Sequence, residues 1–197
     1  MHRPIHSRRS VVIGILGLLG GCSGLPSDGS TPTTVSSNPA RGDVTQIGEL
    51  SLTSPAFEDG GTIPTEYGHA ERNVNPPLAI SGTPDETESF TLIMDDPDAV
   101  SPAGKVWLHW LVWNIPPGLT EIPEAWNPTD AIQGTNDFGD RGYGGPDPPD
   151  AVHTYRFKLF ALDSQLDPSS DATKDEIGWA MADHVIEQTQ LDGTYAP

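Results

Sequence analysis

The chain has 197 residues, of which 28 are acidic and ten basic, and its formal net charge at pH 7 is −18. Three basic residues lie within the first 22 positions, which leaves seven against 28, or −21, for the remainder. Such a chain has no basic patch to meet phosphates, which excludes a nucleic-acid-binding protein. The acidic residues are spread singly and in pairs, a distribution typical of the solubilising surface of a halophilic protein.

The first 22 residues have the pattern of an export signal. Arg8 and Arg9, which resemble a twin-arginine signal, precede an apolar stretch at 11–19 that is too short to span a membrane. Leu-Gly-Gly-Cys at 19–22 resembles a lipobox, and Cys22 is the only cysteine in the sequence, which excludes an intrachain disulfide. We therefore expect an exported lipoprotein, anchored in the cell-surface membrane outside the cytoplasm through lipidated Cys22. The alternative is an ordinary signal peptide with an incidental cysteine.

The composition then divides the rest of the chain in two. Residues 23–46 are rich in Ser, Thr, Pro, Gly and Asp, and they predict a flexible tether that buries no core. Residues 47–197, about 150 in number, fit one domain of ordinary size.

Within this domain, the pattern up to the middle of the chain predicts strands. Short extended segments are expected at 49–57, 62–67 and 78–80, between turns rich in Gly and Pro. Two longer runs, 90–94 and 106–115, are apolar at consecutive positions, so both faces of their sheet should be covered. They flank an acidic turn.

The second half of the domain predicts a loop, a strand and a helix. The loop covers 121–133, and an apolar strand follows at 154–162. A C-terminal helix is expected from Asp171 to about Leu191, capped by Ser170 or Asp171. Its inner stripe would consist of Ile177, Met181, Val185 and Gln188.

Residues able to do chemistry gather at the ends of the predicted strands. They are Asp96, Asp98, His109 and His153, beside a Gly- and Pro-rich loop at 139–149. A His/His/Asp metal site would fit these residue types, although no HExxH spacing supports it. General acid–base work also fits, without a Gly-x-Ser-x-Gly nucleophile, as does an anion site that uses histidine, tyrosine and backbone N–H donors. A fourth possibility is that His109 has only a structural role, as a core histidine with its hydrogen bonds satisfied. The residue types alone do not decide among a metal site, acid–base catalysis, an anion site and this structural role.

Three ordered motifs carry a resemblance to a known family. They are Asp-Pro-Asp-Ala at 96–99, Trp-x-His followed by an aromatic and Leu-Val-x-Asn at 107–114, and Gly-Tyr-x-Gly-Pro-x-Pro-Pro with His-x-Tyr at 142–155. Together with the end of the chain they resemble the phosphatidylethanolamine-binding protein family, in its bacterial and archaeal Raf kinase inhibitor-like branch. The resemblance covers about residues 49–197. It implies a mainly β fold, an antiparallel Greek-key β-sandwich with short flanking helices and a C-terminal helix.

The resemblance also implies a small anion pocket without a metal or cofactor. Its ligand would be a phosphate-like group or a phospholipid headgroup, and Asp96 would orient a histidine or receive an ammonium group. Relatives often carry arginine after the second histidine, where this chain has Thr154, so weaker phosphate affinity is expected. The implied ligand-binding residues are Asp96, Trp107, His109, Gly145, Pro148, Pro149, His153 and Tyr155.

These observations predict a non-catalytic ligand-binding module rather than an enzyme. Binding is expected to strengthen as the pH falls through about 6.5, the ordinary histidine pKa, because protonation adds positive charge. One alternative is an inhibitor or scaffold that contacts a partner protein, such as a kinase or protease, through its surface. The other is a cryptic hydrolase that uses His109, His153 and Asp96.

Overall fold

The computed structural model describes residues 38–197. The predicted export signal, the lipidated Cys22 and the tether as far as residue 37 lie outside these residues. Within 38–197, no helix combines the length and the apolar character that a membrane span requires.

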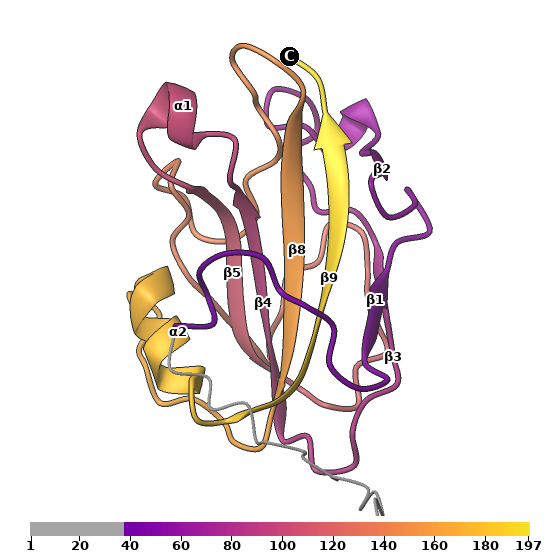
Figure 1. Cartoon of the computed structure of the whole chain (residues 1–197), viewed down its shortest axis with the longest axis vertical. Helices are drawn as coiled ribbons and strands as arrows, with labels where there is room; N and C mark the ends of the chain where they lie inside the picture. Colours follow the sequence, from indigo (N-terminus) through magenta and orange to yellow (C-terminus); the bar gives the residue numbers. More distant parts are fainter. Residues whose placement is uncertain (1–37) are drawn as a thin grey trace, which may run out of the picture. The chain divides into compact units, whose positions relative to one another are not determined.

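The described part of the chain is mainly β, with a six-stranded mixed sheet and a three-stranded sheet (Figure 1). The large sheet has the order β2-β9-β8-β4-β5-β7, in which only the β2–β9 pair is parallel, and the small sheet has the order β1-β3-β6. The mainly β class with short helices is confirmed, and the Greek-key β-sandwich stays a prediction. The strands are β1 (Ser51–Thr53), β2 (Gly61–Thr62), β3 (Leu78–Ser81), β4 (Ser89–Asp96), β5 (Trp107–Ile115), β6 (Glu121–Ile122), β7 (Ile132–Gln133), β8 (His153–Leu162) and β9 (Val185–Tyr195); the helices are the 3₁₀ turn η1 (Thr65–Tyr67), α1 (Val100–Ala103) and α2 (Lys174–Met181).

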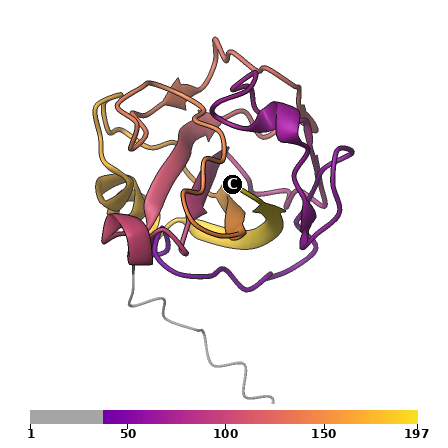
Figure 2. The ribbon, with the colours of Figure 1, turned by 90° about the horizontal axis from the view of Figure 1, so that it is seen from above.

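The central strands are covered on both faces, as their unbroken apolar runs predict. Leu92 and Trp110 share one buried cluster with Ile80 of the small sheet. Ile93 belongs to a second cluster, which includes Ile177 of α2. Figure 2 shows α2 and β1 on opposite sides of the central strands. Each large side chain buried in this way contributes about 1.5–3 kcal/mol to folding.

The prediction of one long C-terminal helix is wrong. Helix α2 ends at Met181, and from Val185 the chain forms β9, which pairs antiparallel with β8 along its whole length. Beyond Met181 burial alternates, with Thr189, Leu191 and Gly193 buried and their neighbours partly exposed. The two-residue period and the unpaired edge of β8 outweigh a helical stripe that continued only through Val185 and Gln188.

The start of α2 also differs from the expectation. Thr173 is the N-cap, and its side chain accepts a hydrogen bond from the Glu176 N–H while the Glu176 carboxylate accepts one from the Thr173 N–H. This capping box satisfies two donors at once, which a cap at Ser170 or Asp171 would not do. The expected loop at 121–133 contains the two-residue strands β6 and β7.

The chain enters the fold earlier than its composition suggests. Residues 38–47, which we call the N-terminal strap, cross the outer face of β8 and β9 (Figure 1). Ala40 is fully buried, and Ile47 forms a bridge to Gln188. The expected tether boundary at residue 46 is therefore too late, because backbone carbonyls of the strap meet buried donors of β8.

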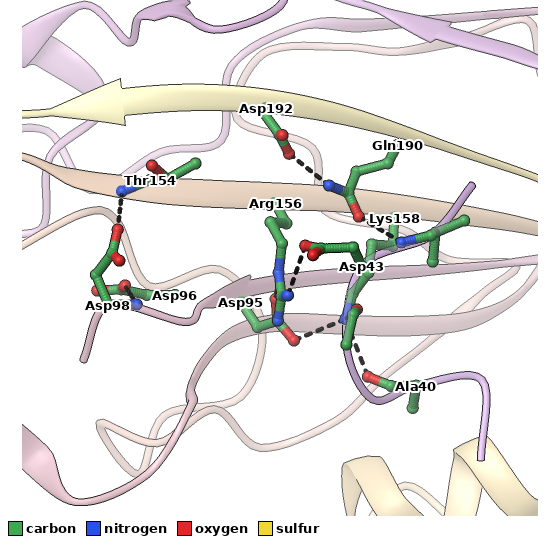
Figure 3. A network of polar contacts seen from close by, with 12 residues as sticks. Ala40, Asp43, Asp95, Asp96, Asp98, Thr154, Arg156, Lys158, Gln190 and Asp192 are labelled. Carbon is green, nitrogen blue, oxygen red and sulfur yellow. Dashed lines mark hydrogen bonds and ion pairs between the residues drawn. The ribbon is translucent and has the colours of Figure 1, made fainter. Parts of the chain in front are cut away.

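Those donors belong to a buried ion cluster on the outer face of the large sheet (Figure 3). Asp95 is fully buried and accepts from Arg156 Nε at 2.8 Å, Lys158 Nζ at 2.7 Å and Lys174 Nζ at 3.2 Å. Burial alone would raise the pKa of Asp95, but the three cations hold it below its ordinary value. Burial lowers the pKa of Lys158 to about 8 against the opposing attraction of Asp95. The carboxylate at the end of a buried strand is thus met by donors, as its free-energy cost requires.

Candidate functional site

A β-bulge turns His109 out of the regular sheet pattern. Strands β4 and β5 pair Met94 with Trp110 and then Asp95 with Leu108, so His109 is an extra residue in β5. Leu108 and Trp110 consequently belong to different core clusters, although residues two apart in a regular strand share a face. Bulges re-aim side chains in this way, and His109 lines a cavity instead.

The cavity lies at the ends of β4, β5 and β8 and has a volume of about 230 Å³. This is room for a small group such as a phosphate, and less than the cavities that hold drug-sized ligands. Five of the eight predicted residues line it, and their charged and polar groups face mainly apolar neighbours. The lining consists of Asp96, Ala99, Pro102, Ala103, Trp107, His109, Phe138, Asp147, Pro149 and His153.

Three predicted residues lie behind the lining or beside it. The Gly145 carbonyl accepts a hydrogen bond from His109 Nδ1 at 3.1 Å. Tyr155 is fully buried, with its ring edge-on to His109 at 5.0 Å between centroids. Pro148 lines a neighbouring cavity instead, which includes the C-terminal residues. Gly145 and Tyr155 therefore position His109.

Sequence reasoning missed several lining residues, of which Phe138 is the largest. Its ring stacks on His69 at 4.0 Å and meets Trp107 and His109 edge-on at 5.4 and 5.5 Å. An aromatic residue beside Gly139 in a glycine-dense loop is the signal that could have identified it. Asp147, between two prolines of the same loop, carried no such signal.

Asp96 is held by three donors. Its Oδ1 accepts from the backbone N–H groups of Asp98 at 2.8 Å and Ala99 at 3.1 Å, which places it at the start of the turn into α1. Its Oδ2 accepts from His153 Nδ1 at 2.7 Å. The neighbouring Asp98 accepts from the Thr154 N–H at 2.8 Å and so ties this turn to β8 (Figure 3).

His153 is a cation by virtue of its partners. Nδ1 faces Asp96 at 2.7 Å, and Nε2 faces Asp150 at 3.0 Å. A carboxylate can only accept, so both ring nitrogens carry protons. Burial lowers the pKa of His153, but hydrogen bonds to Asp96 and Asp150 raise it above its ordinary value overall.

His109 is the opposite case. Its Nδ1 lies 2.8 Å from the Gly144 carbonyl and 3.1 Å from the Gly145 carbonyl, which fixes the proton on Nδ1. Burial lowers the pKa of His109 despite these carbonyls and Asp96. The two histidines therefore do not titrate together near pH 6.5, as the sequence led us to expect. The pKa of His153 lies above this value and the pKa of His109 lies below it.

Among the described residues that line the cavity, no cationic side chain is free of a carboxylate partner. Lys105 lies outside the lining, 4.8 Å above the Trp107 ring, and pairs with Asp137 at 2.7 Å. Across residues 38–197, no three His, Cys, Asp or Glu side chains are grouped so as to hold a metal ion.

Comparison with known proteins places this arrangement in a family. A family model described as phosphatidylethanolamine-binding protein matches residues 53–196. A UPF0098 protein of Methanothermobacter thermautotrophicus is 46% identical over 151 residues, which cover 74% of this chain and 98% of the relative. A UPF0098 protein of Pyrococcus horikoshii is 44% identical, with 72% and 74% covered.

Two crystal structures have the same fold. A phosphatidylethanolamine-binding protein homologue from Chlamydia trachomatis has a TM-score of 0.72 and 38% identity, with 77% of this chain and 99% of the homologue covered. YbcL of E. coli, described as a member of the mammalian PEBP family, has a TM-score of 0.70 and 33% identity, with 76% and 99% covered. On the family match and these identities, the chain belongs to the phosphatidylethanolamine-binding protein family.

Proposed function

We propose that the chain is a non-catalytic binding module whose cavity takes a small phosphate-like group, either free or as part of a phospholipid headgroup. The observation that carries this proposal is the convergence of Asp96, His109 and buried, cationic His153 on one cavity of about 230 Å³. The family's description, which names a phospholipid with a phosphate group, supports the same ligand class.

A donor without a partner supports an oxygen-rich ligand. Trp107 lines the cavity, and its buried indole Nε1 has no hydrogen-bond partner among the described residues. An unpaired buried donor costs about 1–3 kcal/mol, so a ligand oxygen would recover part of that cost once the Trp107 ring turns its N–H toward the cavity.

Two features of the lining argue against hydrolysis through a side-chain nucleophile with His153 as its base. Among the described residues that form it there is no serine, threonine or cysteine to act as a nucleophile. His153 and Asp96 bond to each other, and His153 has a carboxylate on each ring nitrogen, which leaves it no lone pair to accept a proton as a base.

Calorimetric titration tests the proposal directly. Phosphoethanolamine is titrated into the purified full-length protein and into His153→Ala, which loses the one cation among the described residues of the lining. The variant should bind the phosphate group about ten- to a hundredfold more weakly, because the attraction between the His153 cation and the anion is lost. His184→Ala is the matched control, since exposed His184 also pairs with an aspartate, Asp163, but lies outside the lining. Equal affinity in all three proteins, or no binding by the wild type, would contradict the proposal.

We further propose that the protein is exported and anchored in the membrane through lipidated Cys22. The support is the sequence pattern alone, in which a basic segment, a short apolar segment and a lipobox-like motif precede the only cysteine. Cys22→Ser should move the protein from the membrane fraction to the medium, and Ser23→Ala should leave it in place. Retention of Cys22→Ser in the membrane at the wild-type level would exclude lipidation as the anchor.

A further inference from the structure

His109 keeps one ring nitrogen available to a ligand. Its Nδ1 donates to the carbonyls of Gly144 and Gly145, so in the neutral ring Nε2 carries the lone pair. Nε2 has no hydrogen-bond partner among residues 38–197, and it is not one of the buried polar atoms sealed from solvent. The ring lines the cavity. His109 Nε2 therefore offers the ligand a hydrogen-bond acceptor, whereas an anion site would be expected to offer a donor.

We propose that the cavity binds an oxyanion in its protonated, singly charged form, whose hydroxyl donates a hydrogen bond to His109 Nε2. This inference rests on the proposed function and specifies which form of the ligand the site takes. A phosphate monoester exists in both forms near neutral pH, because its second pKa is about 6.

The charges around the cavity disfavour a doubly charged ligand. Asp96 and Asp147 line it, and Asp150 lies against His153. Against these three carboxylates stands one cation, His153. Lys105 is engaged by Asp137. Thr154, which follows His153, contributes no charge. A dianion would enter surroundings that are already net negative, whereas one proton on the ligand halves its repulsion.

The charge of His153 favours an oxyanion over an ammonium group. Asp96, the buried carboxylate of the lining, already accepts three hydrogen bonds, so it has little capacity left for an ammonium. The His153 cation attracts an anion and repels an ammonium. A protonated oxyanion fits both His153 and His109, because its negative charge is attracted by His153 while its hydroxyl donates to His109 Nε2.

The surroundings of His109 keep its ring uncharged. Phe138 and Tyr155 flank it edge-on, Asp96 faces it across the cavity, and Asp95 acts on it from the other face of the sheet. Burial dominates these groups and lowers the pKa of His109. At neutral pH the ring therefore presents a lone pair.

A pair of ligands of equal charge tests the inference. At pH 6 a large fraction of methyl phosphate is singly charged and carries a hydroxyl, whereas dimethyl phosphate is singly charged and has none. With affinities referred to the singly charged form, the full-length protein should bind methyl phosphate at least about tenfold more tightly. Its apparent affinity should fall about tenfold for each pH unit well above the second pKa of the ligand, as the protonated form disappears.

The His109→Asn variant separates the two ring nitrogens. The asparagine amide keeps a donor near the position of Nδ1 for the Gly144 carbonyl, but it has no acceptor where Nε2 stood. The preference for methyl phosphate over dimethyl phosphate should therefore shrink toward unity. Nitrogen NMR of the wild-type ring gives a second readout, in which Nε2 should remain unprotonated in both the free and the bound protein at pH 7.

The outcomes distinguish this inference from the proposed function. If neither ligand binds at any pH, the proposed function fails and this inference fails with it. If both bind equally, or if Nε2 becomes protonated in the complex, the cavity binds phosphate groups but His109 does not select the protonated form.

Discussion

Replacing Asp95 by asparagine is expected to lower the free energy of unfolding by about 3–5 kcal/mol. The substitution keeps the shape of the side chain and removes the charge that Arg156, Lys158 and Lys174 share. Lys158 is fully buried and would keep only uncharged acceptors, namely the strap carbonyls of Ala40 and Gly42 and the amide oxygen of the new side chain. An uncompensated buried ammonium is the reason for the large effect.

Urea unfolding at fixed salt measures this effect, and Asp175→Asn is the control. Asp175 also pairs with a cation, Arg41, but both side chains are largely exposed, so its loss should cost less than about 1 kcal/mol. The wild type should in addition lose stability in acid. The pKa of Asp95 is lower in the folded state than in the unfolded chain, so its contribution is present above pH 3.8 and is lost as the pH falls. Equal losses in the two variants would show that the cluster contributes no more than a surface ion pair.

Gly145→Ala is the second substitution with a large expected effect. A Cβ at this position would lie 2.3 Å from the Tyr67 carbonyl oxygen and 2.6 Å from backbone atoms of Gly68 and His69. These are backbone atoms, which cannot rotate away, so the whole loop must shift. Overpacking of this kind costs about 1–3 kcal/mol. The shift would also move the carbonyl that fixes His109, so methyl phosphate binding should weaken more than tenfold.

Gly118→Ala is the matched control, because a Cβ there has no neighbour within 4 Å. It should change the free energy of unfolding by no more than about 0.5 kcal/mol and leave binding intact. Thermal unfolding and calorimetric titration of the two variants, measured side by side, give both comparisons. Wild-type affinity in a folded Gly145→Ala protein would mean that the loop backbone does not position His109.

The strands of this fold were predictable where burial alone determines them. The runs at 90–94 and 106–115 are apolar at consecutive positions, and the structure buries both faces of β4 and β5. The helix expected at the C-terminus ends at Met181, and the chain beyond it forms β9, because pairing with β8 outweighs a weak helical stripe. Long-range pairing of this kind leaves little trace in a single sequence, and the same is true of the strap over β8.

The sequence predicted which residues form the site better than it predicted what each of them does. The motifs around Asp96, His109 and His153 point to one cavity, and the structure brings the three together. Nothing in the sequence shows the bulge that aims His109, because Leu108 and Trp110 have the same apolar character on either side of it. The charge states depend on Asp150 and on two backbone carbonyls, and such partners are visible only in three dimensions.

The N-terminal strap has a practical consequence for where the domain can be cut. A truncated protein that starts at residue 47, where the composition changes, would lack the carbonyls of Ala40 and Gly42 that accept from Lys158. It would also lack the carboxylate of Asp43 that pairs with Arg156. An expression boundary drawn from composition would thus remove part of the interior rather than a dispensable leader, and a truncated protein that keeps these contacts has to begin no later than Ala40.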